Sequence, residues 1–123
     1  MSGALKKTTG ITGLAVAQNP HKALGVLYSK ILRTLEKMPE SAAYRKHTEA
    51  IIKERAAILQ TTPVVQEAEK KINCGQIEEV IIQAQNELTL ARKMLTWRAW
   101  EPLIKEPPSN QWAWPPAQPV EQR

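Results

Sequence analysis

The chain has 123 residues, a formal net charge of +5, and 42% hydrophobic and 24% charged residues. That length allows one domain at most, and the composition is typical of a globular protein. The single cysteine, Cys74, excludes an internal disulfide and a cysteine-rich metal site, and the longest uninterrupted apolar stretch, Leu14 to Ala17, is far too short to span a bilayer.

The N-terminal segment, residues 1–18, is predicted to be an extended arm. It holds three of the five glycines and shows no helical period, so we expect order only where something covers it. The first acidic residue is Glu36, and residues 1–60 carry ten Lys/Arg against four Glu. This basic, acid-free start weakly resembles a mitochondrial targeting segment. The basic excess of residues 1–60 is equally typical of a solvated helix face, or of a surface that binds nucleic acid, an acidic membrane or an acidic protein.

Two long helices are predicted next. Asn19 can cap the first helix, Pro20 suits its first position and Pro39 ends it. Ser41 can cap the second helix, whose apolar stripe is thinner. The stripe expected to face the core recurs at three- and four-residue steps. It consists of Leu24, Leu27, Tyr28, Ile31, Leu32, Leu35 and Met38 in the first helix, and of Tyr44, Thr48, Ile51, Ile52, Ala56 or Arg55, and Leu59 in the second.

A short helix and then the longest helix follow. Thr62, before a proline, repeats the capping signal, and Gly75 is placed to end the short helix in a left-handed conformation. The last helix begins near Ile77, keeps an apolar stripe for five turns and is closed by Pro102. The acidic pair Glu78–Glu79 in its first turn is explained by the helix dipole.

The C-terminal tail holds an unusual set of residues. All four tryptophans fall in the last 27 residues, and prolines punctuate the same stretch. Because Trp97 and Trp100 are three residues apart, they are predicted to share a face of the last helix, whereas Trp112 and Trp114 lie on an extended, partly polyproline II segment.

Together these patterns predict an all-α fold: a small bundle of three long helices plus one short helix, with an extended N-terminal arm and an extended Pro/Trp-rich tail. The expected divisions are an arm at 1–18, a helical bundle at 19–101 and a tail at 102–123.

Residues that could carry chemistry are scarce. His21 and His47 have no ligand spacing, and Cys74 has no base nearby in sequence. The paired carboxylates sit at helical positions where the dipole or solvation explains them, and no phosphate-binding glycine motif is present. We therefore expect no catalytic, metal-binding or cofactor-binding residues and no activity of the chain's own.

Two interpretations of the tail remain open. It could fold back and cover the bundle, or it could meet another protein. Burying two tryptophans gains on the order of 10 kcal/mol, whereas ordering about 14 residues of backbone costs on the order of 14–28 kcal/mol. A partner surface would therefore help. The suspected partner-binding residues are Trp97, Trp100, Trp112, Trp114, Pro107, Pro108 and Pro115.

Several runs of residues resemble one family. They are Leu5–Gly10, Ala42–Lys46, Leu90–Met94, Trp97–Leu103 with its W-x-x-W-E-P pattern, and Gln111–Pro115 with its W-x-W-P pattern. On these runs the chain is similar to the 13-kDa B accessory subunits of mitochondrial NADH:ubiquinone oxidoreductase, respiratory complex I. The resemblance covers most of residues 4–115, and residues 116–123 run past the usual end of the pattern.

The resemblance implies a non-catalytic helical subunit on the matrix side of the mitochondrial inner membrane, in the peripheral arm of the complex. It also implies contact with the core 30-kDa iron–sulfur-protein-fraction subunit and with the 42-kDa accessory subunit. The flavin, the iron–sulfur clusters and the quinone site belong to other subunits. The alternative is a basic helical adaptor or RNA-binding module, since basic residues can bind the phosphates of a single RNA strand while exposed aromatic rings stack on its bases.

Overall fold

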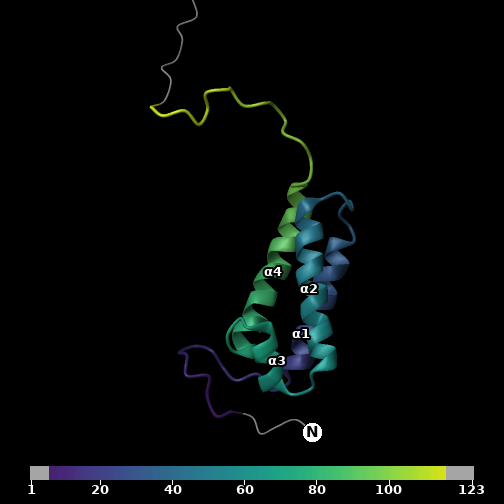
Figure 1. The fold of residues 1–123 in the computed structure, drawn as a ribbon, viewed down its shortest axis with the longest axis vertical. Helices are drawn as coiled ribbons and strands as arrows, with labels where there is room; N and C mark the ends of the chain where they lie inside the picture. The colour runs from purple at the N-terminus through teal and green to yellow at the C-terminus, as the bar shows by residue number, and fades with distance from the viewer. Residues whose placement is uncertain (1–5, 116–123) are drawn as a thin grey trace, which may run out of the picture.

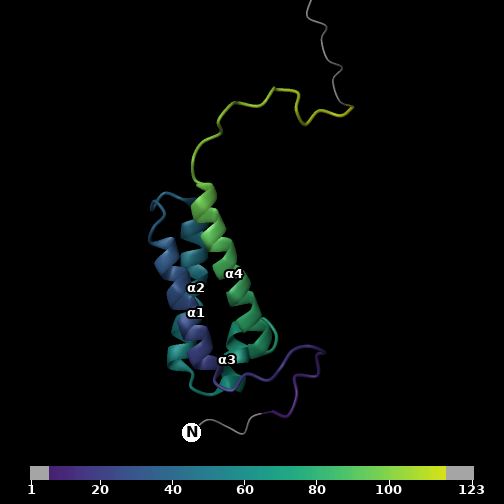
Figure 2. The same ribbon diagram turned by 180° about the vertical axis from the view of Figure 1, so that it is seen from behind.

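A computed structural model describes residues 6–115 as four helices, with no strand in that part of the chain. The helices are α1 (Pro20–Leu35), α2 (Ala43–Thr61), α3 (Val65–Ile72) and α4 (Ile77–Trp97). The predicted all-α class, with three long helices and one short one, is confirmed. Figures 1 and 2 show α1, α2 and α4 lying side by side, with α3 and the N-terminal arm at one end and the C-terminal tail leaving from the other.

The core lies along α1, which packs against α4 on one side and α2 on the other. Four residues at helical spacing on α1 are almost fully buried, and they are Leu24, Tyr28, Ile31 and Leu35. Facing them, α4 contributes Ile77, Val80, Ala84 and Leu88. Within residues 6–115, none of the helices combines the length and the apolar composition that crossing a membrane requires.

The start of α1 follows the prediction, whereas the start of α2 does not. The Asn19 side chain accepts a hydrogen bond from the Lys22 N–H, as an N-cap should. Ser41 does not cap α2, because the helix begins one residue later, with Ala42 at the N-cap and no side-chain cap. Of the stripe expected on α2, Thr48, Ile52 and Leu59 are buried, but Ile51 is exposed.

The ends of α3 also differ from the prediction. Thr62 is not a cap for α3; its N–H donates to the Ile58 carbonyl, so it still belongs to the end of α2. Lys71 then donates to the Thr62 hydroxyl over 2.9 Å. The residue that ends α3 is Asn73, which is left-handed with φ of 57°; Gly75, two positions later, is also left-handed as expected, with φ of 88°. Asparagine is the residue that most readily replaces glycine in this role.

The last helix is shorter than expected. Its final residue is Trp97, and Arg98 takes a left-handed conformation with φ of 54° while its N–H donates to the Met94 carbonyl. The helix therefore stops four residues before Pro102 could have ended it. As a result Trp100 lies beyond the helix, in a turn, and does not share a helical face with Trp97.

Candidate protein interface

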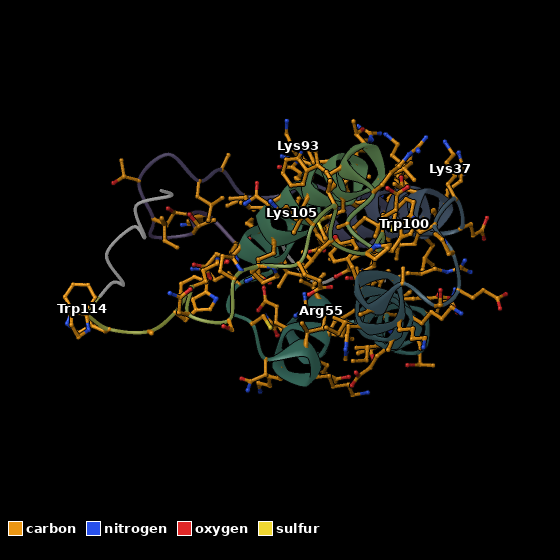
Figure 3. All side chains as sticks on the ribbon, turned by 90° about the horizontal axis from the view of Figure 1, so that it is seen from above. Lys37, Arg55, Lys93, Trp100, Lys105 and Trp114 are labelled. Carbon is orange, nitrogen blue, oxygen red and sulfur yellow. The ribbon has the colours of Figure 1, made fainter. Side chains whose placement is uncertain are left out.

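The first tryptophan pair lies at the end of the bundle from which the tail leaves, where α4 ends. Trp97, in the last turn of α4, is 63% exposed. Trp100 is turned back by the left-handed Arg98 and packs against the edge of the core, where it is partly buried. Figure 3 shows Trp100 over the helices in this end-on view. The two side chains therefore have different roles. Trp100 packs on the core, and only Trp97 is exposed enough to contact another protein.

The second pair lies on the tail, far from the helices. Figures 1 and 3 show the tail running away from the bundle, with Trp114 near its far end. Trp112 is 90% and Trp114 is 87% exposed. The prolines suspected of binding a partner, Pro107, Pro108 and Pro115, are exposed as well.

Every residue from 101 to 115 is exposed, so this part of the tail does not cover the bundle. The first interpretation of the tail, folding back on its own helices, is therefore wrong for residues 101–115. Only two local bonds shape its end, from the Gln111 N–H to the Pro108 carbonyl and from the Ala113 N–H to the Asn110 carbonyl, each 3.1 Å. The structure does not bring the two tryptophan pairs together.

Beside Trp97 the surface is hollowed and positively charged. A shallow depression of about 310 Å³ is lined by Thr89, Arg92, Lys93, Thr96 and Trp97. These residues recur at three- and four-residue steps, which places them on one face of α4. The spacing is visible in the sequence, but the tryptophan pattern alone did not indicate the two basic residues, Arg92 and Lys93, beside Trp97. An aromatic ring flanked by two cations suits a partner that offers both an apolar and an acidic group.

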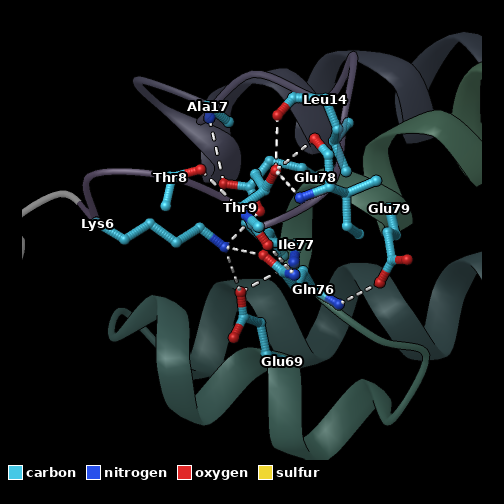
Figure 4. A network of polar contacts seen from close by, with 12 residues as sticks. Lys6, Thr8, Thr9, Leu14, Ala17, Glu69, Gln76, Ile77, Glu78 and Glu79 are labelled. Carbon is cyan, nitrogen blue, oxygen red and sulfur yellow. Dashed lines mark hydrogen bonds and ion pairs between the residues drawn. The ribbon is translucent and has the colours of Figure 1, made fainter.

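The N-terminal arm is anchored by the chain itself, at the start of α4 (Figure 4). The Lys6 ammonium donates to Glu78 over 2.6 Å and to the Gln76 side chain over 2.7 Å. The Ala17 N–H donates to the other Glu78 oxygen over 3.2 Å, and the Gln76 amide donates to the Thr9 carbonyl over 2.7 Å. Residues 6–17 are thereby held against the bundle without a partner.

Glu78 is the residue of this network whose burial its sequence position did not indicate. Its position in the first turn of α4 suggested a solvated carboxylate near the helix dipole, but its side chain is only 3% exposed. Burial by itself would raise the pKa of Glu78. The hydrogen bond from Lys6, those from the backbone N–H groups of Glu78 and Ala17, and the charge of Lys6 hold that pKa below its usual value. Glu78 is therefore an ionised anchor for the arm.

Polar side chains join α2 to α4. The Tyr44 hydroxyl donates to Glu87, and burial, followed by this hydrogen bond and the charge of Glu87, raises the pKa of the phenol. Arg55 donates to the Cys74 sulfur over 3.1 Å and to the Gln83 side chain over 3.4 Å. The Tyr44–Glu87 and Arg55–Gln83 contacts therefore join α2 to α4 directly, whereas Cys74 lies in the loop before α4.

The other residues considered as metal ligands or catalytic groups are His21, His47 and Cys74, and none of them lies in a cluster of metal ligands among residues 6–115. His21 Nε2 lies 2.8 Å from the Thr62 carbonyl, and His47 is exposed. Cys74 is free and accepts the bond from Arg55. Among residues 6–115, no cluster of three or more His, Cys, Asp or Glu side chains is arranged to hold a metal ion.

These observations define a class of protein: a small helical module that presents aromatic side chains at one end and on a proline-rich tail. Comparison with known proteins gives the family. Residues 13–79 match the family described as the ETC complex I subunit conserved region. The chain belongs to this family.

Named relatives are similar to this chain over most of its length. The chain is 55% identical to NADH dehydrogenase [ubiquinone] 1 alpha subcomplex subunit 5 of Bos taurus, over 94% of this chain and 99% of the relative. It is 54% identical to the probable subunit of that name from Caenorhabditis elegans, over 89% of this chain and 73% of the relative. The probable mitochondrial subunit from Arabidopsis thaliana is 41% identical over 78% of this chain and 57% of its own length. The resemblance drawn from the tryptophan and proline motifs is confirmed.

Proposed function

We propose that this chain is a non-catalytic accessory subunit of mitochondrial respiratory complex I that stabilises the matrix-facing peripheral arm. It supports electron transfer from NADH to ubiquinone only as part of the assembled enzyme. Family membership and the names of the relatives support the complex, and the mitochondrial name of the plant relative supports the compartment. In this proposal the chain lies at the inner membrane on the matrix side, without a membrane span of its own.

One observation supports attachment of the subunit through its tail: the most exposed aromatic residues of the described chain lie there. Trp112 and Trp114 are almost wholly exposed, although each offers roughly 150–250 Å² for burial. Because removing apolar surface from water is favourable, burying these two rings in pockets of another subunit would contribute strongly to the binding free energy. The tail, with Pro107, Pro108 and Pro115, acts as a stiffened strap that loses less entropy on docking than a flexible chain would.

The expected partners are the core 30-kDa iron–sulfur-protein-fraction subunit and the 42-kDa accessory subunit. Trp97, with Arg92 and Lys93 beside it, offers a second contact at the end of the bundle. Two contacts joined by one short tail bind more tightly than either alone, because the second docks from a high effective concentration.

The alternative, a basic helical adaptor or RNA-binding module, rests on the ten Lys/Arg of residues 1–60 and on the exposed tryptophans. Three of those cations are paired with carboxylates, Lys6 with Glu78 at 2.6 Å, and Arg45 and Lys53 with Glu49 at 3.3 Å and 2.6 Å. The tryptophans lie outside this basic half, in a segment that also carries Glu101 and Glu106, so we do not propose this function.

The test is to express the chain truncated after Leu103 in cells that lack the endogenous protein. Blue-native electrophoresis then reports whether it migrates with the complete enzyme. We expect the full chain to co-migrate and the truncated chain to be lost from the complex. The matched control changes the tail but spares its anchors, as Ser109→Ala with Gln111→Ala, and should assemble normally. Normal assembly and activity without the tail would reject the strap, and absence of the full chain from the complex would reject the proposed function.

A further inference from the structure

A groove runs between α1 and α2, away from the tail and the basic hollow of α4. Its volume is about 940 Å³, and the residues lining it include Lys22, Gly25, Val26, Lys30 and Arg33 on α1. The α2 side consists of Ala56, Leu59 and Gln60. We call this feature the α1–α2 groove.

The floor of the groove is apolar and partly open. Val26 is 45% exposed although it faces a groove. Gly25 lies on the same turn of α1, and a Cβ atom built on it meets no other atom within 4 Å. The space above this glycine is therefore unfilled, and Leu32 and Ala56 extend the apolar floor on either side of it.

The charges around the groove have one sign. Lys22, Lys30 and Arg33 are exposed and line it, and no carboxylate does. Within residues 6–115, none of these three side chains forms an ion pair, in contrast to Lys6, Arg45, Lys53 and Arg98. Unpaired cations around an apolar floor are complementary to a segment that is acidic along its edges and apolar between them.

We infer that the α1–α2 groove receives an acidic amphipathic helix from another subunit of the complex. This inference rests on the proposed function and adds to it a second attachment site, remote from the tail. Lys22 and Lys30 are eight residues apart on α1, or about 12 Å at 1.5 Å per residue. A helix lying along the groove would match them with carboxylates about eight residues apart and would place its aliphatic side chains over Gly25 and Val26.

A protein helix fits the groove better than a nucleic acid does. Two ring-bearing residues line it: Tyr28 is 1% exposed and offers no face for a base to stack on, and His21 is half-buried with its Nε2 2.8 Å from the Thr62 carbonyl. Aliphatic groups such as Val26 and Leu32 instead match the apolar face of a helix.

The experiment places a photo-crosslinking amino acid at Val26 in the full chain, within the assembled complex. A second position, Lys46, is exposed outside the groove and serves as the reference. We expect the Val26 probe to attach to a segment of another subunit that is rich in Glu or Asp and helical in its spacing. The Lys46 probe should not attach to that segment.

Two variants test the groove's chemistry. Lys30→Glu with Arg33→Glu reverses the rim, and it should lower the Val26 cross-link roughly tenfold, whereas Lys46→Glu should leave it unchanged. Gly25→Leu fills the open space and should also lower the cross-link. Since leucine is a better helix former than glycine, this change should not unfold α1.

The outcomes separate the two proposals. Co-migration with the complex without a Val26 cross-link, or with cross-links only to lipid, nucleic acid or a basic segment, would overturn the groove inference and leave the proposed function intact. A cross-link that persists at full yield in both variants would overturn it as well. Absence of the chain from the complex would overturn both proposals at once.

Discussion

Glu78 shows at the residue scale how one buried carboxylate fixes an irregular arm. Replacing it by glutamine removes the ion pair with Lys6, which measures 2.6 Å, while the amide keeps nearly the same volume. We expect the free energy of unfolding at pH 7 to fall by about 1.5–3 kcal/mol, the usual range for a hydrogen bond to a charged group. Urea titration of the purified chain measures it.

The same carboxylate should make stability depend on pH. Because the folded protein lowers the pKa of Glu78, its contribution is present above the unfolded pKa and is lost as the pH falls through the folded value. The difference between wild type and Glu78→Gln should therefore shrink below about pH 4. Glu54→Gln, at an exposed position with no ion pair in residues 6–115, is the control and should change stability by less than about 0.5 kcal/mol. An equal loss in both variants would contradict the role given to Glu78.

The two tyrosines offer a second comparison, since both carry a hydroxyl but only one hydroxyl is bonded. Tyr44 donates to Glu87, whereas the buried Tyr28 hydroxyl makes no hydrogen bond of normal geometry among residues 6–115, although the nearby Arg55 guanidinium opposes the rise that burial causes in its pKa. Tyr44→Phe should lower the free energy of unfolding by about 1 kcal/mol. Tyr28→Phe should leave it unchanged or raise it, because removing an unsatisfied buried hydroxyl removes a desolvation cost. Thermal melts of both variants decide this, and a larger loss from Tyr28→Phe would refute it.

At the scale of helices, the apolar periodicity was enough to predict which elements form, but not where each one ends. The stripe of α1 predicted Leu24, Tyr28, Ile31 and Leu35 as core because helical spacing alone puts them on one face. The end of α4 could not be predicted in this way, since a left-handed Arg98 has no sequence signature comparable to glycine. The arm itself was predicted, but its anchoring was not, because the anchor pairs Lys6 with Glu78 across 72 positions.

The same early end of α4 separates the roles of two tryptophans that sequence spacing had grouped. Trp100 packs on the core, so Trp100→Ala should lower the free energy of unfolding by about 1–2 kcal/mol, less than the loss at a fully buried site. Trp97→Ala should change stability by less than about 0.5 kcal/mol but reduce incorporation into the complex, because that side chain is exposed beside Arg92 and Lys93. Urea titration and blue-native electrophoresis of both variants measure the two effects. Equal loss of stability in the two variants would contradict the separation.

For the whole molecule, the structure separates what folds from what docks. The bundle buries its core between α1, α2 and α4, and every residue from 101 to 115 is exposed. The chain truncated after Leu103 should therefore unfold at the same urea concentration and with the same slope as the full chain, because the slope reports the surface that unfolding exposes. Hydrogen exchange should show the amides of 104–115 exchanging at nearly the unfolded rate in the isolated chain and slowing in the complex. If truncation destabilises the isolated bundle by more than about 1 kcal/mol, the tail packs on its own helices in solution. The loss of assembly on truncation would then be a folding defect and not the loss of a docking strap.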